Sequence, residues 1–298
     1  MLRISFDLDV LRSFVTGIEL GNFAKAADRL GRSTSAVSAQ LKKLEDQVGA
    51  PILRKAGRGL VLTPAGETLL AYARRLLELN DEAATAVRGV ELEGWIRLGM
   101  AEDFGEHILT DVLGRFARAH PKVRIEAKVA RNAALLEYID AGSLDLTLLW
   151  DSGVATPHSQ QLGQLPMRWI ASADASAIRK PDAANPLPLV AFEAPCLMRS
   201  AATAALDHAG IPWRIAFSSP SLSGIWAAVT AGLGVTVRTE VGLPEKLRVL
   251  DSAAFVLPAL PRLGLKLCQA EAELDAATQR LREIIVDTLE RSGLGAPK

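Results

Sequence analysis

The stretch from Phe23 to Val48 restricts the fold of this chain more than any other part of it. Apolar residues recur there at helical spacing over 23–30 and again over 34–48, and Gly31 lies between the two runs. A glycine can take the left-handed conformation that ends a helix, and Ser33 can cap the helix that follows. Asp7 or Asp9 can cap an earlier helix that ends at Gly21. The sequence therefore predicts three short helices, of which the last two are joined by a tight turn.

The outer face of the third predicted helix is rich in small hydroxyl groups. Its inward residues are Val37, Leu41, Leu44 and Val48, which follow one another at steps of four, three and four. Short hydroxyls can exchange hydrogen bonds with base edges without holding the helix away from a groove, and lysines one turn later can reach phosphates. The pattern therefore predicts contact with the major groove of DNA. The outward residues are Thr34, Ser35, Ser38, Lys42 and Lys43.

A basic β-hairpin is predicted directly after this helix. Residues 52–53 lead into one strand, 57–59 form a turn and 60–62 return, with Arg54, Lys55 and Arg58 near the tip. Between Gly21 and Leu62 there are eight lysines and arginines but three acidic residues, which gives +5 inside a chain of 298 residues whose net charge is +0. Such concentrated charge favours contact with phosphates. A small helical domain with a solvated basic face is the alternative.

A long helix is predicted after the hairpin. Thr63 can cap it, Pro64 suits its first turn, and the apolar pattern continues to about residue 88. Its heptad seam favours a dimer, with Asn80 as the polar residue that fixes the register. Packing on a second domain of the same chain is the alternative. The seam residues are Leu69, Ala73, Leu76, Asn80, Ala83 and Val87.

The remaining two hundred or so residues alternate between strands and helices, which predicts parallel sheet covered by helices on both sides. Two small α/β lobes fit this order, with Pro166 and the stretch near Leu263 as crossings. We expect three domains: 1–62, 63–92 and 93–298. Within the last, lobe I covers about 93–163 and 268–298, and lobe II about 164–267. A cleft between such lobes is where small ligands bind.

No catalytic, metal or cofactor site is predicted. None of the four histidines has metal-ligand spacing with another, and no G-x-S-x-G elbow is present. Cys196 and Cys268 have no metal-like spacing either. Two cysteines without a disulfide framework are typical of buried free thiols in a reducing compartment. The first residues lack the apolar run of a signal peptide, and no stretch is long enough to span a membrane. We therefore expect a cytoplasmic protein without a membrane role, and neither an enzyme nor a substrate-binding protein of the transporter kind.

One continuous segment carries a specific family resemblance: GNFAKAADRLGRSTSAVSAQLKKLEDQVGAPILRKAGRGLVLTPAGE. It resembles the DNA-binding region of LysR-type transcriptional regulators, and the order of parts matches along the whole chain. The resemblance implies an α+β multidomain fold, with an N-terminal winged helix-turn-helix, a long linker helix and a two-lobed effector domain like periplasmic binding proteins. Three later segments resemble the LrhA/HexA/PecT-like branch, which contains regulators of motility, exoproducts and virulence: ARNAALLE, GIPWRIAF and AAVTAGLGVTVR.

The resemblance also implies partners. These are double-stranded promoter DNA, a small-molecule effector, RNA polymerase and further copies of the chain in a homodimer or homotetramer. At the DNA interface, Ala39 stands where the family often has a long polar side chain, and Lys55 stands where an arginine is common. The family's DNA-contacting positions correspond here to Arg32, Ser33, Thr34, Ser35, Ser38, Ala39, Lys42, Lys43, Arg54, Lys55 and Arg58.

The same resemblance locates an effector cleft at the ends of strands and the starts of helices. Helix starts and hydroxyls suit a ligand with a carboxylate, whereas Glu102 and Asp103 would repel one. The alternatives are that these acids cap the next helix, that Arg131 or Arg199 forms a surface ion pair, and that Trp150 is core. The expected cleft residues are Ala101, Glu102, Asp103, Arg131, Asn132, Trp150, Ser219 and Ser221.

Overall fold

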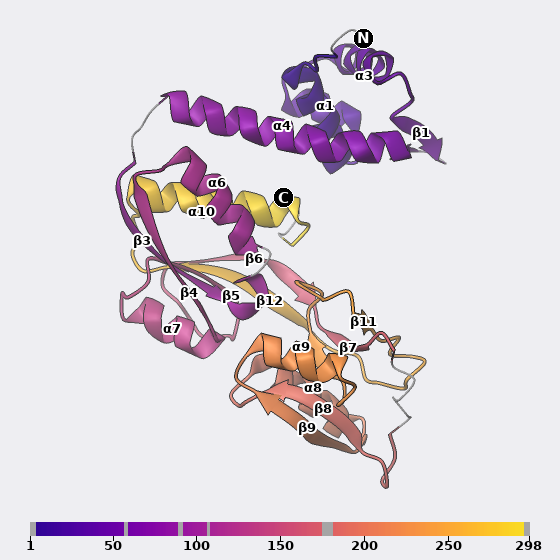
Figure 1. The fold of residues 1–298 in the computed structure, drawn as a ribbon, viewed down its shortest axis with the longest axis vertical. Helices are drawn as coiled ribbons and strands as arrows, with labels where there is room; N and C mark the ends of the chain where they lie inside the picture. Colours follow the sequence, from indigo (N-terminus) through magenta and orange to yellow (C-terminus); the bar gives the residue numbers. More distant parts are fainter. Residues whose placement is uncertain (1–3, 57–58, 89–91, 106–107, 175–180, 295–298) are drawn as a thin grey trace. The chain divides into compact units, whose positions relative to one another are not determined.

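The structure is a computed structural model that describes residues 4–56, 59–88, 92–105, 108–174 and 181–294. The chain divides into two compact units, Met1–Val90 and Glu91–Lys298 (Figure 1).

The first unit begins with three capped helices. They are α1 (Leu8–Glu19), α2 (Phe23–Arg29) and α3 (Thr34–Val48). The side chains of Asp7, Asn22 and Ser33 accept hydrogen bonds from the first backbone N–H groups of the three helices in turn. Gly31 has a φ of 63°, a value that favours glycine, and this allows the short turn between α2 and α3. The predicted helix, tight turn and helix are therefore present.

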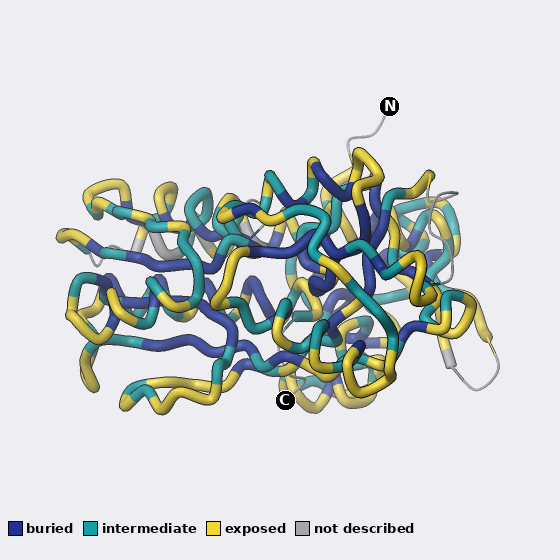
Figure 2. Tube along the Cα trace, turned by 90° about the horizontal axis from the view of Figure 1, so that it is seen from below, coloured by how far each residue is buried: buried dark blue, intermediate teal, exposed yellow. Residues whose placement is uncertain are grey.

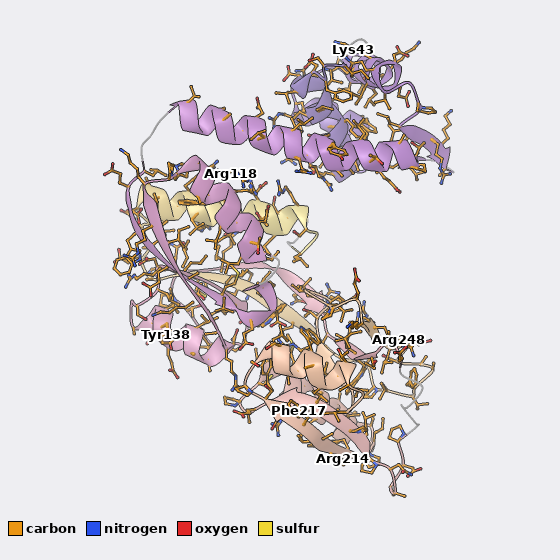
Figure 3. The ribbon with its side chains drawn as sticks, in the orientation of Figure 1. Lys43, Arg118, Tyr138, Arg214, Phe217 and Arg248 are labelled. Carbon is orange, nitrogen blue, oxygen red and sulfur yellow. The ribbon has the colours of Figure 1, made fainter. Side chains whose placement is uncertain are left out.

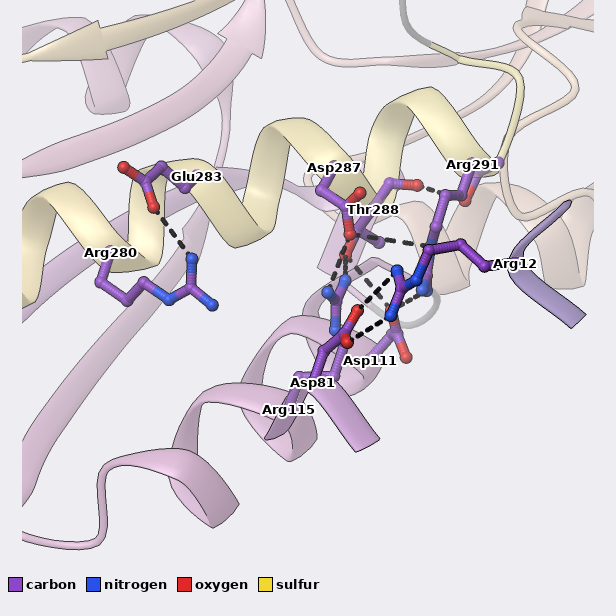
Figure 4. A network of polar contacts seen from close by, with 10 residues as sticks. Arg12, Asp81, Asp111, Arg115, Arg280, Glu283, Asp287, Thr288 and Arg291 are labelled. Atoms are coloured by element: carbon purple, nitrogen blue, oxygen red, sulfur yellow. Dashed lines mark hydrogen bonds and ion pairs between the residues drawn. The ribbon is translucent and has the colours of Figure 1, made fainter. Parts of the chain in front are cut away.

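A small apolar core joins these helices to the long helix α4 (Pro64–Arg88). Arg12 on α1 forms an ion pair with Asp81 on α4, with Nη2 2.6 Å from Oδ1 (Figure 4). Because α4 packs on α1, part of its apolar surface is used inside its own unit. The buried members of this core are Val10, Leu11, Phe14, Val15, Leu44, Ile52, Leu69, Leu70, Ala73 and Leu77.

A β-hairpin lies between α3 and α4. Strands β1 (Leu53–Ala56) and β2 (Gly59–Leu62) are antiparallel, and Leu53 is opposite Leu62. Glu45 Oε1 accepts from the backbone N–H of Ile52 at 2.9 Å, and the Thr63 hydroxyl donates to the Pro51 carbonyl at 2.7 Å. The first bond ties the start of the hairpin to α3, and the second joins the two ends of the hairpin directly before α4 begins.

The second unit is built around a five-stranded sheet in the order β4-β3-β5-β12-β6. Helices α6 (Ile108–Ala119) and α10 (Ala276–Arg291) cover one face, and α7 (Asn132–Asp140) covers the other (Figure 1). The inner strands are largely buried, as the dark blue tube shows (Figure 2). The strands are β3 (Gly94–Ala101), β4 (Val123–Ala130), β5 (Leu146–Trp150), β6 (Ser159–Pro166) and β12 (Arg262–Gln269).

The expectation of a parallel sheet was confirmed only in part for this lobe. β3, β4 and β5 are parallel, whereas β12 is antiparallel to both β5 and β6. β6 escaped prediction because its sequence, SQQLGQLP, is mostly polar, as an exposed edge strand permits. Since β6 runs to Pro166 and β12 begins at Arg262, the expected lobe limits near 163 and 268 cut into two strands of this sheet.

Among its described residues, the second lobe contains two smaller sheets and two helices. β7 (Arg168–Ser172) lies between β10 (Thr236–Arg238) and β11 (Leu247–Val249), and β8 (Leu187–Phe192) is parallel to β9 (Trp213–Ser219). A bridge between Leu189 and Val235 joins β8 to the first of these sheets. Helices α8 (Leu197–His208) and α9 (Leu222–Thr230) pack on these strands, and a four-residue helix, α5 (Glu102–Gly105), follows β3 in the other lobe.

Ion pairs hold α6 against α10 in the first lobe (Figure 4). Arg115 donates to the Thr288 hydroxyl at 2.9 Å and pairs with Asp287 at 2.8 Å. Asp111 accepts from Thr288 at 3.2 Å and from Arg291 at 3.3 Å. The network links two helices that are far apart in the sequence.

The close approach of α4 to the start of the hairpin gives a stability prediction. A Cβ at Gly66 would lie 2.0 Å from the carbonyl oxygen of Ile52, which is backbone and cannot turn aside. Gly66→Ala should therefore destabilise the first unit, although alanine is the better helix former by about 1 kcal/mol. The measurement is the rate of amide hydrogen exchange in α3 and α4, which should increase.

The control is Gly114→Ala on α6, where the nearest atom is the flexible end of Arg118, at 3.2 Å. That change should leave exchange in α3 and α4 as it is. Equal exchange in the wild type and the Gly66 variant would show that the contact does not limit how α4 packs.

Candidate nucleic-acid interface and ligand cleft

Helix α3 has one buried face and one exposed polar face. Val37 and Leu44 are 1% and 0% exposed, whereas Thr34, Ser35, Ser38 and Ala39 are exposed. The four-three-four spacing of the apolar residues is the reason, since it directs them all to one side of the helix. The predicted contact face is therefore open to solvent.

Local hydrogen bonds hold the hydroxyls of this face in place. Ser33 Oγ accepts from Ala36 N at 3.2 Å and lies 3.0 Å from Ser35 Oγ. Ser38 Oγ donates to the carbonyl of Thr34 at 2.9 Å. A hydroxyl that donates to its own helix still has lone pairs that can accept from a base. Rotamers that are fixed in advance lose less entropy when a side chain contacts a binding partner.

Cationic side chains surround the hydroxyl face. Lys42, Lys43, Arg54 and Lys55 are exposed, and Figure 3 shows Lys43 on α3. Arg32 is already paired with Asp9 at 2.7 Å, which holds its guanidinium beside the start of α1. The remaining predicted residue, Arg58, lies outside the described residues. Lysine and arginine in this arrangement can bind phosphates on both sides of a groove.

Helix α4 leaves a second apolar stripe exposed. Tyr72, Leu76 and Leu79 are 59%, 40% and 61% exposed, and Ala83 continues the same four-three-four spacing. The dimer seam expected from the sequence needs a correction here, because Leu69 and Ala73 are buried in the core of their own unit at 7% and 0% exposure. One stripe of α4 therefore packs inside its own unit and another is exposed, while the dimer and packing on a second domain both stay predictions.

A cavity of about 310 Å³ lies in the second unit between the two lobes. It forms at the carboxyl ends of β3, β4 and β5, as expected for α/β sheets. Asn132 fixes one wall, because its amide group bonds both the N–H and the carbonyl of Trp150, at 2.8 and 2.9 Å. Six of the eight expected cleft residues line it: Ala101, Glu102, Asp103, Arg131, Asn132 and Trp150.

The floor of the cavity contains a buried ion pair. Asp103 on α5 accepts from Nε and Nη2 of Arg238 on β10, at 3.1 and 2.5 Å, and the two side chains are 3% and 5% exposed. The other carboxylate oxygen accepts from Trp150 Nε1 at 2.8 Å. Three donors thus satisfy a carboxylate that would be very costly to bury alone. Asp103 therefore joins the lobes and does not cap the next helix.

Ser219 and Ser221 do not line this cavity, which corrects the expectation for both. Ser219 Oγ accepts from the N–H of Ser221 at 3.1 Å, and Ser221 Oγ accepts from Gly224 at 3.3 Å at the start of α9. Their hydroxyls are used by their own backbone. The next donor at this helix start, the N–H of Leu222, binds Glu102 Oε2 at 2.6 Å.

Comparison with known proteins identifies both units. Residues 8–67 match the family described as bacterial regulatory helix-turn-helix protein, lysR family, and residues 89–290 match the LysR substrate binding domain. The chain belongs to the LysR family of bacterial transcriptional regulators. It is a DNA-binding transcriptional regulator with an effector-binding domain, as the resemblance of its first segment predicted.

Similar LysR regulators include PecT from Dickeya dadantii and DgdR from Burkholderia cepacia. PecT is 35% identical over 89% of this chain and 82% of its own length, and DgdR is 36% identical over 88% and 87%. The similarity to PecT agrees with the branch that the later segments resembled. Among solved structures, HinK from Pseudomonas aeruginosa has a TM-score of 0.53 at 22% identity, covering 98% of this chain and 99% of its own. Full-length BenM has a TM-score of 0.53 at 19% identity, covering 98% and 99%, and both likenesses concern the fold.

Sequence reasoning missed several residues of this regulator's cavity. Arg238 and Phe192 lie on β10 and β8, and Cys196 and Met198 lie at the start of α8. One signal for Arg238 was available, since an arginine that ends the apolar run GVTV must be either exposed or paired. Nothing in the sequence pointed to Phe192 as a cavity residue, because it ends an apolar strand whose other residues pack in the core of the second lobe.

None of the regulator's helices, within the described residues, is long and apolar enough to cross a membrane. Over the same ranges, no group of three or more histidine, cysteine, aspartate or glutamate side chains could hold a metal ion.

The buried pair gives a stability prediction. Asp103→Asn keeps the side-chain size but leaves Arg238 buried without a counter-charge, so the free energy of unfolding of the second unit should fall by about 3–5 kcal/mol. A double-mutant cycle with Arg238→Gln should show that the two losses do not add. Urea unfolding monitored by tryptophan fluorescence measures both.

The control is Glu93→Gln, which breaks the exposed pair with Lys122. It should change the free energy of unfolding by less than about 1 kcal/mol. Additive losses in the cycle would mean that Asp103 and Arg238 stabilise the unit independently of each other.

Proposed function

We propose that α3 of this LysR regulator enters the major groove and that Thr34, Ser35, Ser38 and Ala39 face the base edges. The observation that supports this most directly is the division of α3 into a buried apolar face and an exposed face of short side chains. Side chains of this size let the helix approach the groove floor, where base pairs differ in their donors, acceptors and methyl groups. The Ala39 methyl suits an apolar contact with thymine.

The cations contribute affinity and orientation in this proposal. Lys42 and Lys43 continue from the hydroxyl face along α3, and Arg54 and Lys55 extend from β1. Arg32 and Ser33 lie at the turn before α3, and Arg32 would meet a phosphate after releasing Asp9. Arg58 belongs to the same predicted set. Contacts with phosphate fix the register of the protein on DNA and carry no base information themselves.

We propose further that the regulator is a dimer through α4. The exposed stripe of Tyr72, Leu76, Leu79 and Ala83 has the spacing of a helix-helix contact, and Val87 is 87% exposed. A second copy would cover this stripe and give two α3 helices for paired half-sites. A tetramer and contact with RNA polymerase stay predictions. Since its partner is chromosomal DNA, we expect the protein to act in the cytoplasm.

The cavity between the lobes is proposed as the effector site. It is large enough for a small molecule, and groups from both lobes form its wall. A ligand in this place would alter DNA binding to the extent that it favours one arrangement of the lobes over another. Footprinting on the chain's own upstream region, with and without metabolite extracts, tests the DNA and effector roles together.

Replacing Ser38 tests the groove contact. Ser38→Arg should reduce binding to the chain's own operator by tenfold or more, about 1.4 kcal/mol, because a long side chain at the centre of the face holds α3 away from the bases. Binding to unrelated DNA should be kept or increased by the added charge. Gel shifts with operator and scrambled duplexes measure both.

Lys55→Ala is the matched comparison. It should weaken binding to the operator and to scrambled duplexes by the same factor. It should also lower the slope of the logarithm of the binding constant against the logarithm of the salt concentration by about one unit. An unchanged footprint for the Ser38 variant would contradict the groove contact. A changed base preference for the Lys55 variant would mean that the hairpin reads bases.

The dimer proposal predicts a change in mass. Leu79→Asp places a charge in the exposed stripe, so the variant should sediment as a monomer and lose operator affinity. Ala71→Asp adds the same charge on the polar side of α4 and should sediment as the wild type does. Equal sedimentation of the two variants would argue that α4 does not form the interface.

A further inference from the structure

The carboxyl edge of β3 and β4 carries two neighbouring opposite charges that do not pair with each other. Ala101 is the register partner of Ala130, so Glu102 and Arg131 follow the two strands side by side. Each side chain instead reaches the second lobe. Glu102 Oε2 accepts from Leu222 N at 2.6 Å, and Arg131 Nη2 donates to the carbonyls of Glu193 and Pro195 at 2.6 and 2.5 Å.

The two arginines of the wall share one aromatic ring. The guanidinium carbon of Arg238 lies 4.6 Å from the ring centre of Phe192, and that of Arg131 lies 5.8 Å from it. Arg238 is already neutralised by Asp103. The described wall therefore contains two carboxylates and two guanidinium groups, with a net formal charge of zero, and each of the four has a protein partner.

The rest of the described wall is mostly apolar. Trp150 and Phe192 give aromatic surface, and the aliphatic surface comes from Leu136, Val154, Leu197 and Met198. A ligand carboxylate in this cavity would lose its water and lie near Glu102 as well as Arg131, so attraction and repulsion would offset each other. The helix-start N–H of Leu222, a donor that suits an anion, is taken by Glu102.

We propose that the cavity selects an uncharged, largely apolar ligand, aromatic or acyl, over a carboxylate of the same shape, and that Glu102 sets this preference. The ligand's acceptor, such as a carbonyl oxygen, meets the guanidinium of Arg131, whose Nη2 carries the two bonds to carbonyls among the described contacts. The inference rests on the proposed effector role of this cavity and adds the chemical class of the effector.

Two isosteric probes test the charge preference on the full-length protein. 2-Acetylnaphthalene and 2-naphthoate have nearly the same shape and differ in one negative charge. Calorimetry should give a dissociation constant for the ketone about tenfold below that of the carboxylate. In Glu102→Gln the affinity for 2-naphthoate should rise about tenfold, while the affinity for the ketone should change by less than about twofold. The reason is that glutamine keeps an acceptor for Leu222 N but has no negative charge.

A thiol reports whether the probe is in the cavity. Cys196 lines it, and the ketone should slow alkylation of Cys196 by N-ethylmaleimide. Cys268 does not interfere, since it is 1% exposed and burial raises the pKa of its thiol. Mass spectrometry assigns the modified site.

The matched control is Glu137→Gln, which removes an exposed charge from α7 in the same lobe. Its preference should equal that of the wild type. Equal or tighter binding of 2-naphthoate by the wild type, or no protection of Cys196 by either probe, would overturn the inference. Operator binding is measured on the same samples, so a failure of the proposed DNA role is seen separately.

Discussion

The buried contact between Asp103 and Arg238 is the interaction on which the ligand cleft depends. Each charge is almost fully removed from water, and neither is tolerable there without the other. Asp103 follows β3 of one lobe and Arg238 ends β10 of the other, so their pairing sets how the two lobes meet. Trp150 adds a third donor to Asp103 and also forms part of the cavity wall. One polar cluster therefore positions both the lobes and the surface that a ligand would touch.

The DNA-binding unit is under a different constraint, because the face of α3 that we propose for DNA contact must stay exposed to water. The apolar side of α3 is anchored by Val37 and Leu44, and its hairpin is fixed through Glu45. The hydroxyls of Ser33, Ser35 and Ser38 are held by hydrogen bonds to groups two to four residues away in the chain. A rigid helix with ordered short side chains can meet a groove at little entropic cost. The LysR family combines this unit with an effector domain. In this chain the positive charge is concentrated in the first unit, where the segment from Gly21 to Leu62 carries +5 although the whole chain has a net charge of +0.

Prediction from sequence succeeded where a local pattern decides the outcome and failed where a distant contact does. The caps Asp7 and Ser33 and the glycine turn at Gly31 all follow from a few adjacent residues. β6 was missed because an exposed edge strand needs no apolar pattern. The direction of β12 was missed because no local pattern determines whether a returning strand is parallel. Leu69 and Ala73 were assigned to the interface with a second copy of the chain, because an apolar stripe in the sequence does not show which surface will cover it.

The amino-acid sequence by itself determined the helix-turn-helix, the hairpin and the long helix, because caps, turns and periodicity act over a few residues. The order of strands and helices indicated the two-lobed plan, and the resemblance of the first segment indicated the family. The family resemblance also located six of the residues that line the cavity, at strand ends that meet at one edge of the sheet. Only the tertiary structure decided which groups the charged residues among these six bind. Glu102 binds the start of α9, Asp103 binds Arg238, and Arg131 binds carbonyls beyond β8. Those partners lie some 60 to 135 positions away along the chain, and folding alone brings them within hydrogen-bond distance.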